Sequence, residues 1–455
     1  MLEIEKLYQK TRVRLDEISP SMCLAKWLQV TLHLHTGHNH SCHHPLTHQT
    51  PLSELKTDPS ALHNTTFKKK LQVDMKAGRR PKECGYCWNI EDLGPQYISD
   101  RVIKSAMSWA RHDLQRVVDL PAHGNINPTY VEVSFSNVCN FKCSYCTANF
   151  STGWKEDLRK HGPYATGAGA QTMDILPEED NPYIDAFWKW WPDLVQTLRV
   201  FRITGGEPLL SKNTFQIMED IAAHPRPEME LAINSNLGVS DASFQRFLRL
   251  ATDLTRHRKI KRLSLYTSVD AWGPRAEYIR NGLDFRRFQK NVEAFLQSTA
   301  NTGVIFMVTF NALSPTSFLD LLRYVKDINA RYPRTNDPLI HDGPAIDVDV
   351  SYLREPRYQS VQILPPSYRR HLEEMISYMK AWPFCPEIPE GFGIHEIQKL
   401  ERTLAWMEHE LPESELRDRR RNFYLFFSEH DRRRGTDFLK AFPEMEEFWH
   451  LCRNS

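Results

Sequence analysis

Three cysteines in the middle of the chain have a spacing that can hold an iron–sulfur cluster. An alternating apolar run over residues 131–135 predicts a strand, and Cys139, Cys143 and Cys146 lie in the loop that follows it. Three thiolates at C-x3-C-x2-C spacing can converge on one face of a cuboidal cluster, leaving its fourth iron open to another ligand. The alternative is a zinc knuckle, but zinc usually takes a fourth Cys or His close by, and none follows here.

A glycine-rich motif ends the next predicted strand. The four residues after residue 204 are Gly205, Gly206, Glu207 and Pro208. Two glycines let the backbone approach a ligand closely, and the Glu207 carboxylate is placed to accept from an ammonium group. One strand further on, Ser235 and Asn236 can bond a ribose or a carboxylate, although both residue types also form plain turns.

Four more cysteines lie in the first 90 residues. An alternating run over residues 28–34 and a turn at residues 36–39 predict a hairpin with Cys23 and Cys42 at its base. Cys84 and Cys87 form a C-x2-C turn. Together these residues predict a four-thiolate site, whose metal is zinc or a second [4Fe–4S] cluster.

The composition is that of a soluble globular protein, with 41% hydrophobic and 25% charged residues. The net charge of +1 gives no electrostatic reason to expect a nucleic-acid partner, and no apolar stretch is long enough to span a membrane. The charged amphipathic N-terminus lacks the apolar core of a secretion signal. The nine cysteines are clustered, which favours metal ligation over disulfides and predicts a reducing, cytoplasmic location.

Strand and helix patterns alternate from about residue 127, which predicts βα units and an α/β fold with a parallel sheet. The strands are expected at 129–136, 198–204, 230–235, 262–269, 304–311 and 345–353, with helices at 213–223, 241–255, 285–298, 316–331 and 367–381. Chemistry in such folds gathers at the carboxyl ends of the strands. We therefore expect a metal-binding N-terminal domain over 1–125, a barrel over 126–365 and a helical C-terminal extension over 366–455.

Two regions outside this rhythm have open interpretations. The stretch 149–181 is longer than one βα connection needs, so it is a lid or partner site if it is ordered. An aromatic helix follows at 183–194, whose rings are either functional or helix core. Helices expected at 393–410 and 413–430 interleave arginines with aromatics, a pattern most typical of a solvated face over a packed stripe.

The central motifs resemble those of the radical S-adenosylmethionine (SAM) superfamily. Phe141 and Tyr145 complete the pattern C-x3-C-x-aromatic-C, and Gly205 to Pro208 match the family's GGEP motif. The resemblance implies a partial (β/α)6 barrel of the TIM type, with a SAM-binding [4Fe–4S] cluster on the three central cysteines. It further implies SAM contacts from Tyr145, Gly205, Gly206, Glu207, Pro208, Ser235, Asn236, Ser268, Asp270 and Arg280. Arg280 is otherwise a surface cation at a helix start.

The N-terminal cysteines resemble a second feature of this superfamily. The spacing C-x13-G-x4-C, from Cys23 through Gly37 to Cys42, is similar to the auxiliary-cluster hairpin of the Twitch and SPASM extensions. Those extensions normally follow the barrel, whereas this one precedes it. The resemblance implies an auxiliary [4Fe–4S] cluster, with Cys84 and Cys87 as the remaining ligands and zinc as the alternative.

The expected activity follows from the resemblance. One electron from a flavodoxin- or ferredoxin-type donor cleaves SAM to a 5′-deoxyadenosyl radical, which abstracts hydrogen from a small-molecule or carrier-bound substrate. The auxiliary cluster passes an electron onward or ligates the substrate. Two alternatives are a maturase of ribosomal peptides and a metal-cluster scaffold without catalysis.

Overall fold

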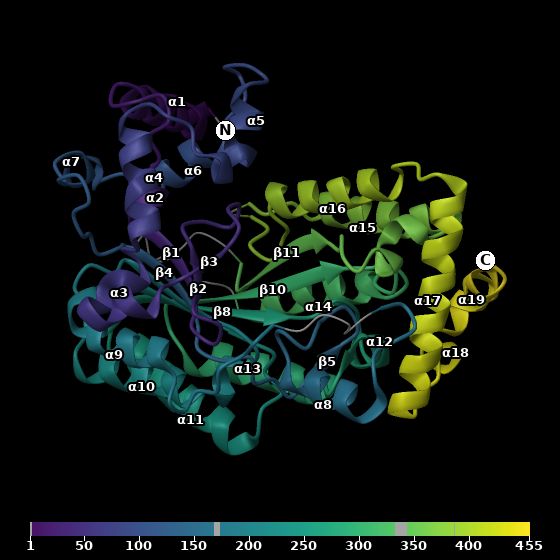
Figure 1. Ribbon diagram of the computed structural model, residues 1–455. Coiled ribbons are helices and arrows are strands. Elements are labelled where there is room, and N and C mark those ends of the chain that lie inside the picture. Colours follow the sequence, from purple (N-terminus) through teal and green to yellow (C-terminus); the bar gives the residue numbers. More distant parts are fainter. Residues whose placement is uncertain (1, 168–172, 333–343, 386) are drawn as a thin grey trace. The chain divides into compact units, whose positions relative to one another are not determined.

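The protein folds as two compact units, seen in a computed structural model that describes residues 2–167, 173–332, 344–385 and 387–455 (Figure 1). Unit 1 comprises Met1–Ser136, Asp174–Gly205 and Glu228–Leu231, and unit 2 comprises Asn137–Met173, Gly206–Pro227 and Ala232–Ser455. These units cut across the three domains predicted from the sequence. Both are α/β, as expected, and their strands are mostly parallel.

The sheet of unit 1 has the order β6-β4-β1-β2-β3. Strands β6 (Val200–Thr204), β4 (Tyr130–Ser134) and β1 (Gln29–His33) are parallel, and β2 (His38–His40) and β3 (His48–Gln49) continue antiparallel. The predicted hairpin between Cys23 and Cys42 is therefore confirmed as β1–β2. Its first strand also pairs with β4, so the N-terminal region adds a parallel strand beside the first predicted barrel strand.

Alternation gives this sheet one apolar face. Val30, Val131 and Phe201 are in register across β1, β4 and β6 and are fully buried. The Phe187 ring of helix α9 (Pro182–Leu194) packs on this core, 6.3 Å from Phe201 and 5.1 Å from Phe135 between ring centroids. The aromatic residues of α9 thus form helix core, as one of the two sequence interpretations held.

Short helices build the rest of unit 1. They are α1 (Leu2–Asp16), α2 (Ala25–Leu28), α3 (Leu52–Thr57), η1 (Pro59–Leu62), α4 (Thr66–Lys76), η2 (Lys82–Cys84), α5 (Gly85–Glu91), α6 (Asp100–Ala106) and α7 (Leu114–Val118). Trp27, Trp88 and Trp109 are buried together in their shared core, and Cys23, Cys84 and Cys87 pack against or within it. These three thiols are therefore held by tertiary packing rather than by a loose loop.

Gly37 in the turn between β1 and β2 is required by its surroundings. Its φ of +71° lies in the left-handed region, where side chains are strained. A Cβ atom there would also meet the Tyr183 ring of α9 at 2.1 Å. The glycine of the C-x13-G-x4-C motif therefore lets the hairpin pack against α9.

Unit 2 contains the remaining predicted strands, β7 (Arg226–Ser235, shared with unit 1), β8 (Ile260–Ser268), β10 (Thr302–Phe310) and β11 (Ile346–Tyr352). β8, β10 and β11 pair in parallel. The helices are α8 (Thr152–His161), α10 (Lys212–Ala223), α11 (Asp241–Arg256), α12 (Pro274–Ile279), α13 (Phe285–Ser298), α14 (Phe318–Arg331), α15 (Arg369–Ala381), α16 (Ile394–Met407), α17 (Glu413–Arg434), α18 (Phe438–Ala441) and α19 (Glu446–Arg453). Short 3-10 turns are η3 (Pro208–Leu210), η4 (Arg357–Gln359), η5 (Val361–Ile363), η6 (Pro366–Tyr368) and η7 (Pro443–Met445).

The stretch predicted as one long loop contains α8. Ser151 caps this helix by accepting a hydrogen bond from the Trp154 backbone N–H at 3.2 Å. Residues 168–172 of the stretch lie outside the described residues. No helix in the described part of the chain is long and apolar enough to cross a membrane.

Helix α17 carries the predicted packed stripe, because Phe423, Phe426 and Phe427 are fully buried. Its last turn is more than a solvated face. The Arg433 guanidinium is buried, pairs with Asp157 of α8 at 3.0 Å, and stacks 3.9 Å over the Tyr164 ring. The basic C-terminal end of α17 therefore packs against α8 and against Tyr164, which follows α8.

Glu396 joins α16 to β11, with α16 lying along that strand (Figure 1). Its carboxylate accepts from the Val348 N–H at 2.6 Å and the Gly393 N–H at 2.5 Å. Burial nevertheless raises its pKa to about 7. Because the folded state then holds a proton that the unfolded state has lost, Glu396 disfavours folding increasingly as pH rises from about 4.5 to about 7.

We expect Glu396→Gln to remove this pH dependence. Across that pH range, the free energy of unfolding of the wild type should fall relative to that of the variant by roughly 2–3 kcal/mol as pH rises. Urea denaturation at several pH values measures it. Glu401→Gln on the same helix, which removes an exposed pair with Lys380, is the control. Parallel pH curves for wild type and Glu396→Gln would contradict the prediction.

Candidate functional site

The loop that carries Cys139, Cys143 and Cys146 lies in unit 2 and is fastened by short backbone contacts. Its two-residue strand β5 (Lys142–Cys143) pairs antiparallel with β9 (Arg280–Asn281). The Ser144 N–H donates to the Ile279 carbonyl at 2.8 Å, and the Trp154 indole N–H donates to the Cys143 carbonyl at 2.9 Å. The loop is thus held in place by parts of the chain far apart in the sequence.

The three thiols of this loop sit in a poorly solvated environment. Cys143 is buried, and Cys139 and Cys146 are half-buried. Burial raises the pKa of all three thiols, to about 12 for Cys139 and Cys146, and the neighbouring Cys143 thiol raises the pKa of those two further. A cation that replaces their protons would relieve this cost, so the donor set fits a thiolate-bound metal cluster.

The GGEP motif packs directly on the cysteine loop. The Glu207 N–H donates to the Val138 carbonyl at 2.7 Å. A Cβ atom on Gly206 would lie 2.3 Å from the same carbonyl oxygen, so only glycine allows this approach. The motif and the start of the cysteine loop are therefore in direct contact.

The Glu207 side chain points into the protein. Its carboxylate accepts from the Ser235 hydroxyl at 2.8 Å, the Asn236 N–H at 2.6 Å and the Leu209 N–H at 3.0 Å. Burial raises its pKa to about 7, against the effect of these bonds. A carboxylate has about four acceptor positions, so Glu207 ties the end of β7 to η3 and keeps capacity for one more donor.

Asn236 connects β7 to the cysteine loop. Its amide nitrogen donates to the Asn140 side chain at 2.9 Å and lies 3.9 Å from the Cys139 sulfur. The ring of Phe141 fills the space beside Gly238 and Gly282, where Cβ atoms would approach it to 2.4 and 2.8 Å. Ser235 and Asn236 therefore act here as supports of the loop and of Glu207.

A second network surrounds Cys143. Asp270 is fully buried and pairs with Arg280, Nε to Oδ2 at 2.8 Å, while it accepts from the Tyr145 hydroxyl at 2.8 Å and the Thr309 N–H at 2.8 Å. Ser268, which ends β8, stands two residues before Asp270. The structure thus brings Tyr145, Asp270 and Arg280 together beside the cysteine loop.

Sequence reasoning missed Gln359 of η4. Its side chain donates to the Ser144 carbonyl at 3.0 Å and accepts from the Ser144 hydroxyl at 2.8 Å. No local motif marks this residue, which meets the loop from 215 positions away. Ser151 was also missed, although a serine three residues before Trp154 is a recognisable helix cap.

A cavity of about 430 Å³ borders the end of the cysteine loop. Its wall includes Tyr145, Cys146, Trp154, Arg357, Tyr358 and Phe426. Aromatic rings share this wall with small, polar and charged residues, and Arg357 forms an ion pair with Glu355 of the same wall at 2.9 Å. The volume lies in the range of small-molecule sites.

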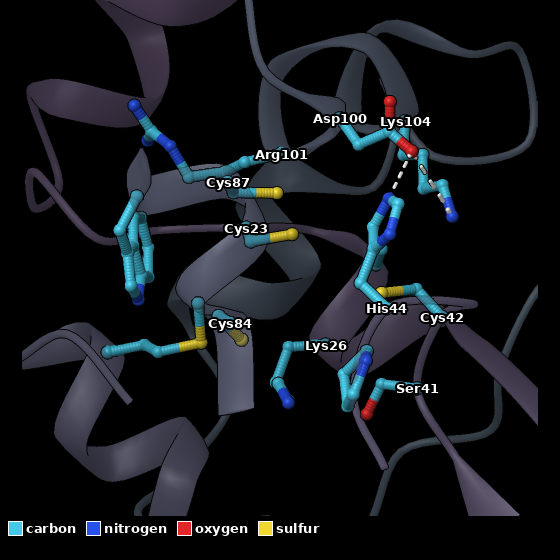
Figure 2. Close-up of a pocket in the computed structure, with 14 residues that line it drawn as sticks. Cys23, Lys26, Ser41, Cys42, His44, Cys84, Cys87, Asp100, Arg101 and Lys104 are labelled. Carbon is cyan, nitrogen blue, oxygen red and sulfur yellow. Dashed lines mark hydrogen bonds and ion pairs between the residues drawn. The ribbon is translucent and has the colours of Figure 1, made fainter. Parts of the chain in front are cut away.

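The four N-terminal cysteines line one cavity within unit 1. Figure 2 shows the sulfurs of Cys23 and Cys87 pointing into it side by side, with the Cys42 sulfur directed inward from the opposite wall. Cys84 completes the set. The predicted juxtaposition of the hairpin and the C-x2-C turn is therefore present.

Basic side chains surround these thiols. Lys26 is buried, forms an ion pair with Glu83, and lines the cavity. Burial opposes its charge, but the nearby Cys84 and Glu83 outweigh that effect and raise its pKa. Arg101 also lines the cavity and donates to the Met22 carbonyl at 2.9 Å, beside Cys23. Burial raises the pKa of Cys84 and Cys87 to about 12, and Lys26 opposes this effect at Cys84 as Lys26 and Arg101 do at Cys23.

Neighbouring histidines mostly have partners within the protein. His44 pairs with Asp100 at 2.7 Å and stacks on Tyr86, and His48 contacts the Thr65 hydroxyl at 3.1 Å. Within the described ranges, no group of three or more His, Cys, Asp and Glu side chains has the arrangement that holds a metal ion.

The central region of the chain is similar to known proteins. Residues 133–325 match the sequence model of the Radical SAM superfamily. Curated relatives include the GTP 3′,8-cyclases of Pasteurella multocida (24% identical over 199 residues, 44% of this chain and 50% of the relative) and Pectobacterium atrosepticum (27% over 201 residues, 43% and 51%). The chain spans about half the length of the curated relatives it matches.

Proposed function

We propose, from the match of residues 133–325 to the Radical SAM superfamily model, that this chain is a radical SAM enzyme in which Cys139, Cys143 and Cys146 hold the [4Fe–4S] cluster that binds SAM. The observation that carries the proposal is the close packing of Gly206 and Glu207 on the Val138 carbonyl, at the start of the cysteine loop. This contact puts three thiols and a buried carboxylate at one place.

When bound, the cluster and SAM supply a 5′-deoxyadenosyl radical, for which the reductant is a low-potential electron donor. The residues of this chain bind and orient. Glu207 has one acceptor position left for the amino group of SAM, and Asn236 and Phe141 fix the loop around it. Tyr145, Asp270 and Arg280 form the buried wall beside Cys143.

We further propose that Cys23, Cys42, Cys84 and Cys87 hold a second [4Fe–4S] cluster, with zinc as the alternative. A four-iron cube takes one thiolate at each iron, so its ligand sulfurs stand farther apart than the sulfurs on a single zinc ion. The shared cavity of the four cysteines and the similarity of the Cys23–Cys42 spacing to the auxiliary-cluster hairpin favour the cluster. Lys26 and Arg101 offset its negative charge.

The substrate is proposed to be a small molecule, free or carrier-bound. Two observations favour it over a ribosomal peptide: the cavity of about 430 Å³ beside Cys146, and the relatives named GTP 3′,8-cyclases. A scaffold without catalysis is the remaining alternative. The intact cysteine loop with GGEP packed against it argues against a scaffold, because a protein that does not bind SAM does not need an open iron.

Anaerobic reconstitution tests the proposal. Purified protein with iron, sulfide, SAM and dithionite is expected to form 5′-deoxyadenosine and methionine, quantified by liquid chromatography and mass spectrometry. Purine nucleotides and short peptides, added separately, show by a rise in 5′-deoxyadenosine which class couples to cleavage. If the reconstituted protein contains four or more irons and forms no 5′-deoxyadenosine, the proposal that it is an enzyme is wrong. Stimulation by peptides alone would favour the maturase alternative.

A further inference from the structure

Arg280 faces a sulfur of the cysteine loop. Cys143 and Arg280 are direct partners in the β5–β9 pair, which places the two side chains together. The Arg280 Nη1 atom lies 3.5 Å from the Cys143 Sγ atom, within hydrogen-bond distance for sulfur. The guanidinium is buried, so water does not compete for this contact.

The remaining face of the guanidinium is fixed by Asp270. Nε and Nη2 of Arg280 contact the two carboxylate oxygens at 2.8 and 3.2 Å. The Tyr145 hydroxyl and the Thr309 N–H hold that carboxylate from the other side, and the Tyr145 ring lies 5.6 Å from the guanidinium carbon. The pair is therefore a rigid dipole whose positive end points at Cys143.

This geometry gives Arg280 a role different from the SAM-carboxylate contact that the resemblance implies. A hydrogen bond from a cation to a cluster thiolate stabilises negative charge on the cluster. The reduced cluster carries one more negative charge than the oxidised one, so the bond stabilises the reduced form more. A buried, water-excluded contact strengthens this effect.

We propose that Arg280 is a positioning residue that raises the reduction potential of the cluster on Cys139, Cys143 and Cys146 through its N–H···S bond to Cys143, with Asp270 and Tyr145 holding it in place. The inference rests on the proposed function, since it requires that cluster. It assigns the Asp270–Arg280 pair to electron uptake, before SAM is bound.

Substitution of Arg280 and substitution of Asp270 should shift the reduction potential of the cluster in opposite directions. A merely structural role of the pair does not predict opposite shifts. Arg280→Gln removes the cation and leaves Asp270 negative, so the potential of the SAM-free cluster should fall. We expect at least a tenfold lower ratio of reduced to oxidised cluster at a fixed ambient potential, equivalent to 59 mV for one electron. Asp270→Asn leaves the cation uncompensated and should shift the ratio in the opposite direction.

Redox titration of the SAM-free protein, followed by electron paramagnetic resonance of the reduced cluster, measures these shifts. Iron content of the variants is checked first, and Arg280→Met, which also removes the cation, replaces Arg280→Gln if the latter does not load. Arg275→Gln on the neighbouring α12, which breaks an exposed pair with Glu444, is the matched control and should leave the potential unchanged. Tyr145→Phe should produce a smaller shift than Asp270→Asn.

Unchanged potentials, or shifts of the same sign in Arg280→Gln and Asp270→Asn, would overturn the inference. An unchanged SAM-free potential with weakened SAM binding in Arg280→Gln would assign Arg280 to the SAM carboxylate instead. If wild-type protein takes up no cluster on its central cysteines, the proposed function itself fails, which is a separate outcome seen before any titration.

Discussion

Cys143→Ala is expected to lose the SAM-binding cluster and with it 5′-deoxyadenosine formation, by more than about 100-fold. Changes to groups around a metal site already cost 10–100-fold, and Cys143 is proposed as a direct ligand. It is also the most buried of the three thiols and the one whose neighbours, Arg280 and Trp154, fix the loop. Iron analysis and the 5′-deoxyadenosine assay on the reconstituted variant measure the loss.

The substitution should lower iron by about four per chain and spare the N-terminal site. Cys385→Ala is the matched control, since Cys385 lies in unit 2 outside the cysteine loop and should keep both iron and activity. Equal activity in Cys143→Ala and wild type would show that the central loop does not hold the reactive cluster. Loss of activity with full iron would instead assign Cys143 to the reaction without a ligand role.

The strands and the central site were predictable because their signals are local. Each barrel strand alternates or runs apolar over five to ten residues and is followed by a helical pattern, so elements such as β8 and α13 appear within a few residues of their expected bounds. The cysteine loop and GGEP stand at strand ends, where parallel strands bring separate segments to one edge.

What the sequence did not reveal depends on distant contacts. β1 pairs with β4 across about 100 residues, and nothing in its alternation distinguishes a barrel strand from a hairpin strand. Gln359 reaches Ser144, and Arg433 reaches Asp157, without any local spacing. A motif pointed to Arg280, but its contact with Cys143 follows from the pairing of β5 with β9. Each of these strands has only two residues, too few to be predicted from the sequence.

For Glu207 and Asp270, too, the sequence located the residue but did not show its contacts within the protein. Both were predicted as SAM contacts from the resemblance to family motifs that stand at strand ends. In the structure each is buried and already bonded to at least three donors of the protein. Position alone therefore locates such a residue, while its hydrogen bonds decide how much of it remains for a ligand.

Cys87→Ala is expected to separate SAM cleavage from product formation. Cys87 is buried in the unit 1 core, on α5, where the Trp88 indole N–H donates to the Pro81 carbonyl and fixes the turn. Its loss removes one proposed ligand and also disturbs the core against which Cys23 and Cys84 pack, so the second cluster should not load and iron should fall from about eight to about four per chain. The central loop is unaltered, so 5′-deoxyadenosine should still form, uncoupled from substrate.

The measurement pairs iron and zinc analysis with product detection on the substrate class identified by the 5′-deoxyadenosine assay. Cys84→Ser provides a second variant with less change in core packing. Ser41→Ala, which lines the same cavity without a thiol, is the control and should retain about eight irons. About four irons with one zinc in wild type would make the N-terminal site structural. Full product formation in a variant with only the central cluster would refute a catalytic role for the four cysteines, because electron transfer or substrate ligation at that site cannot proceed without it.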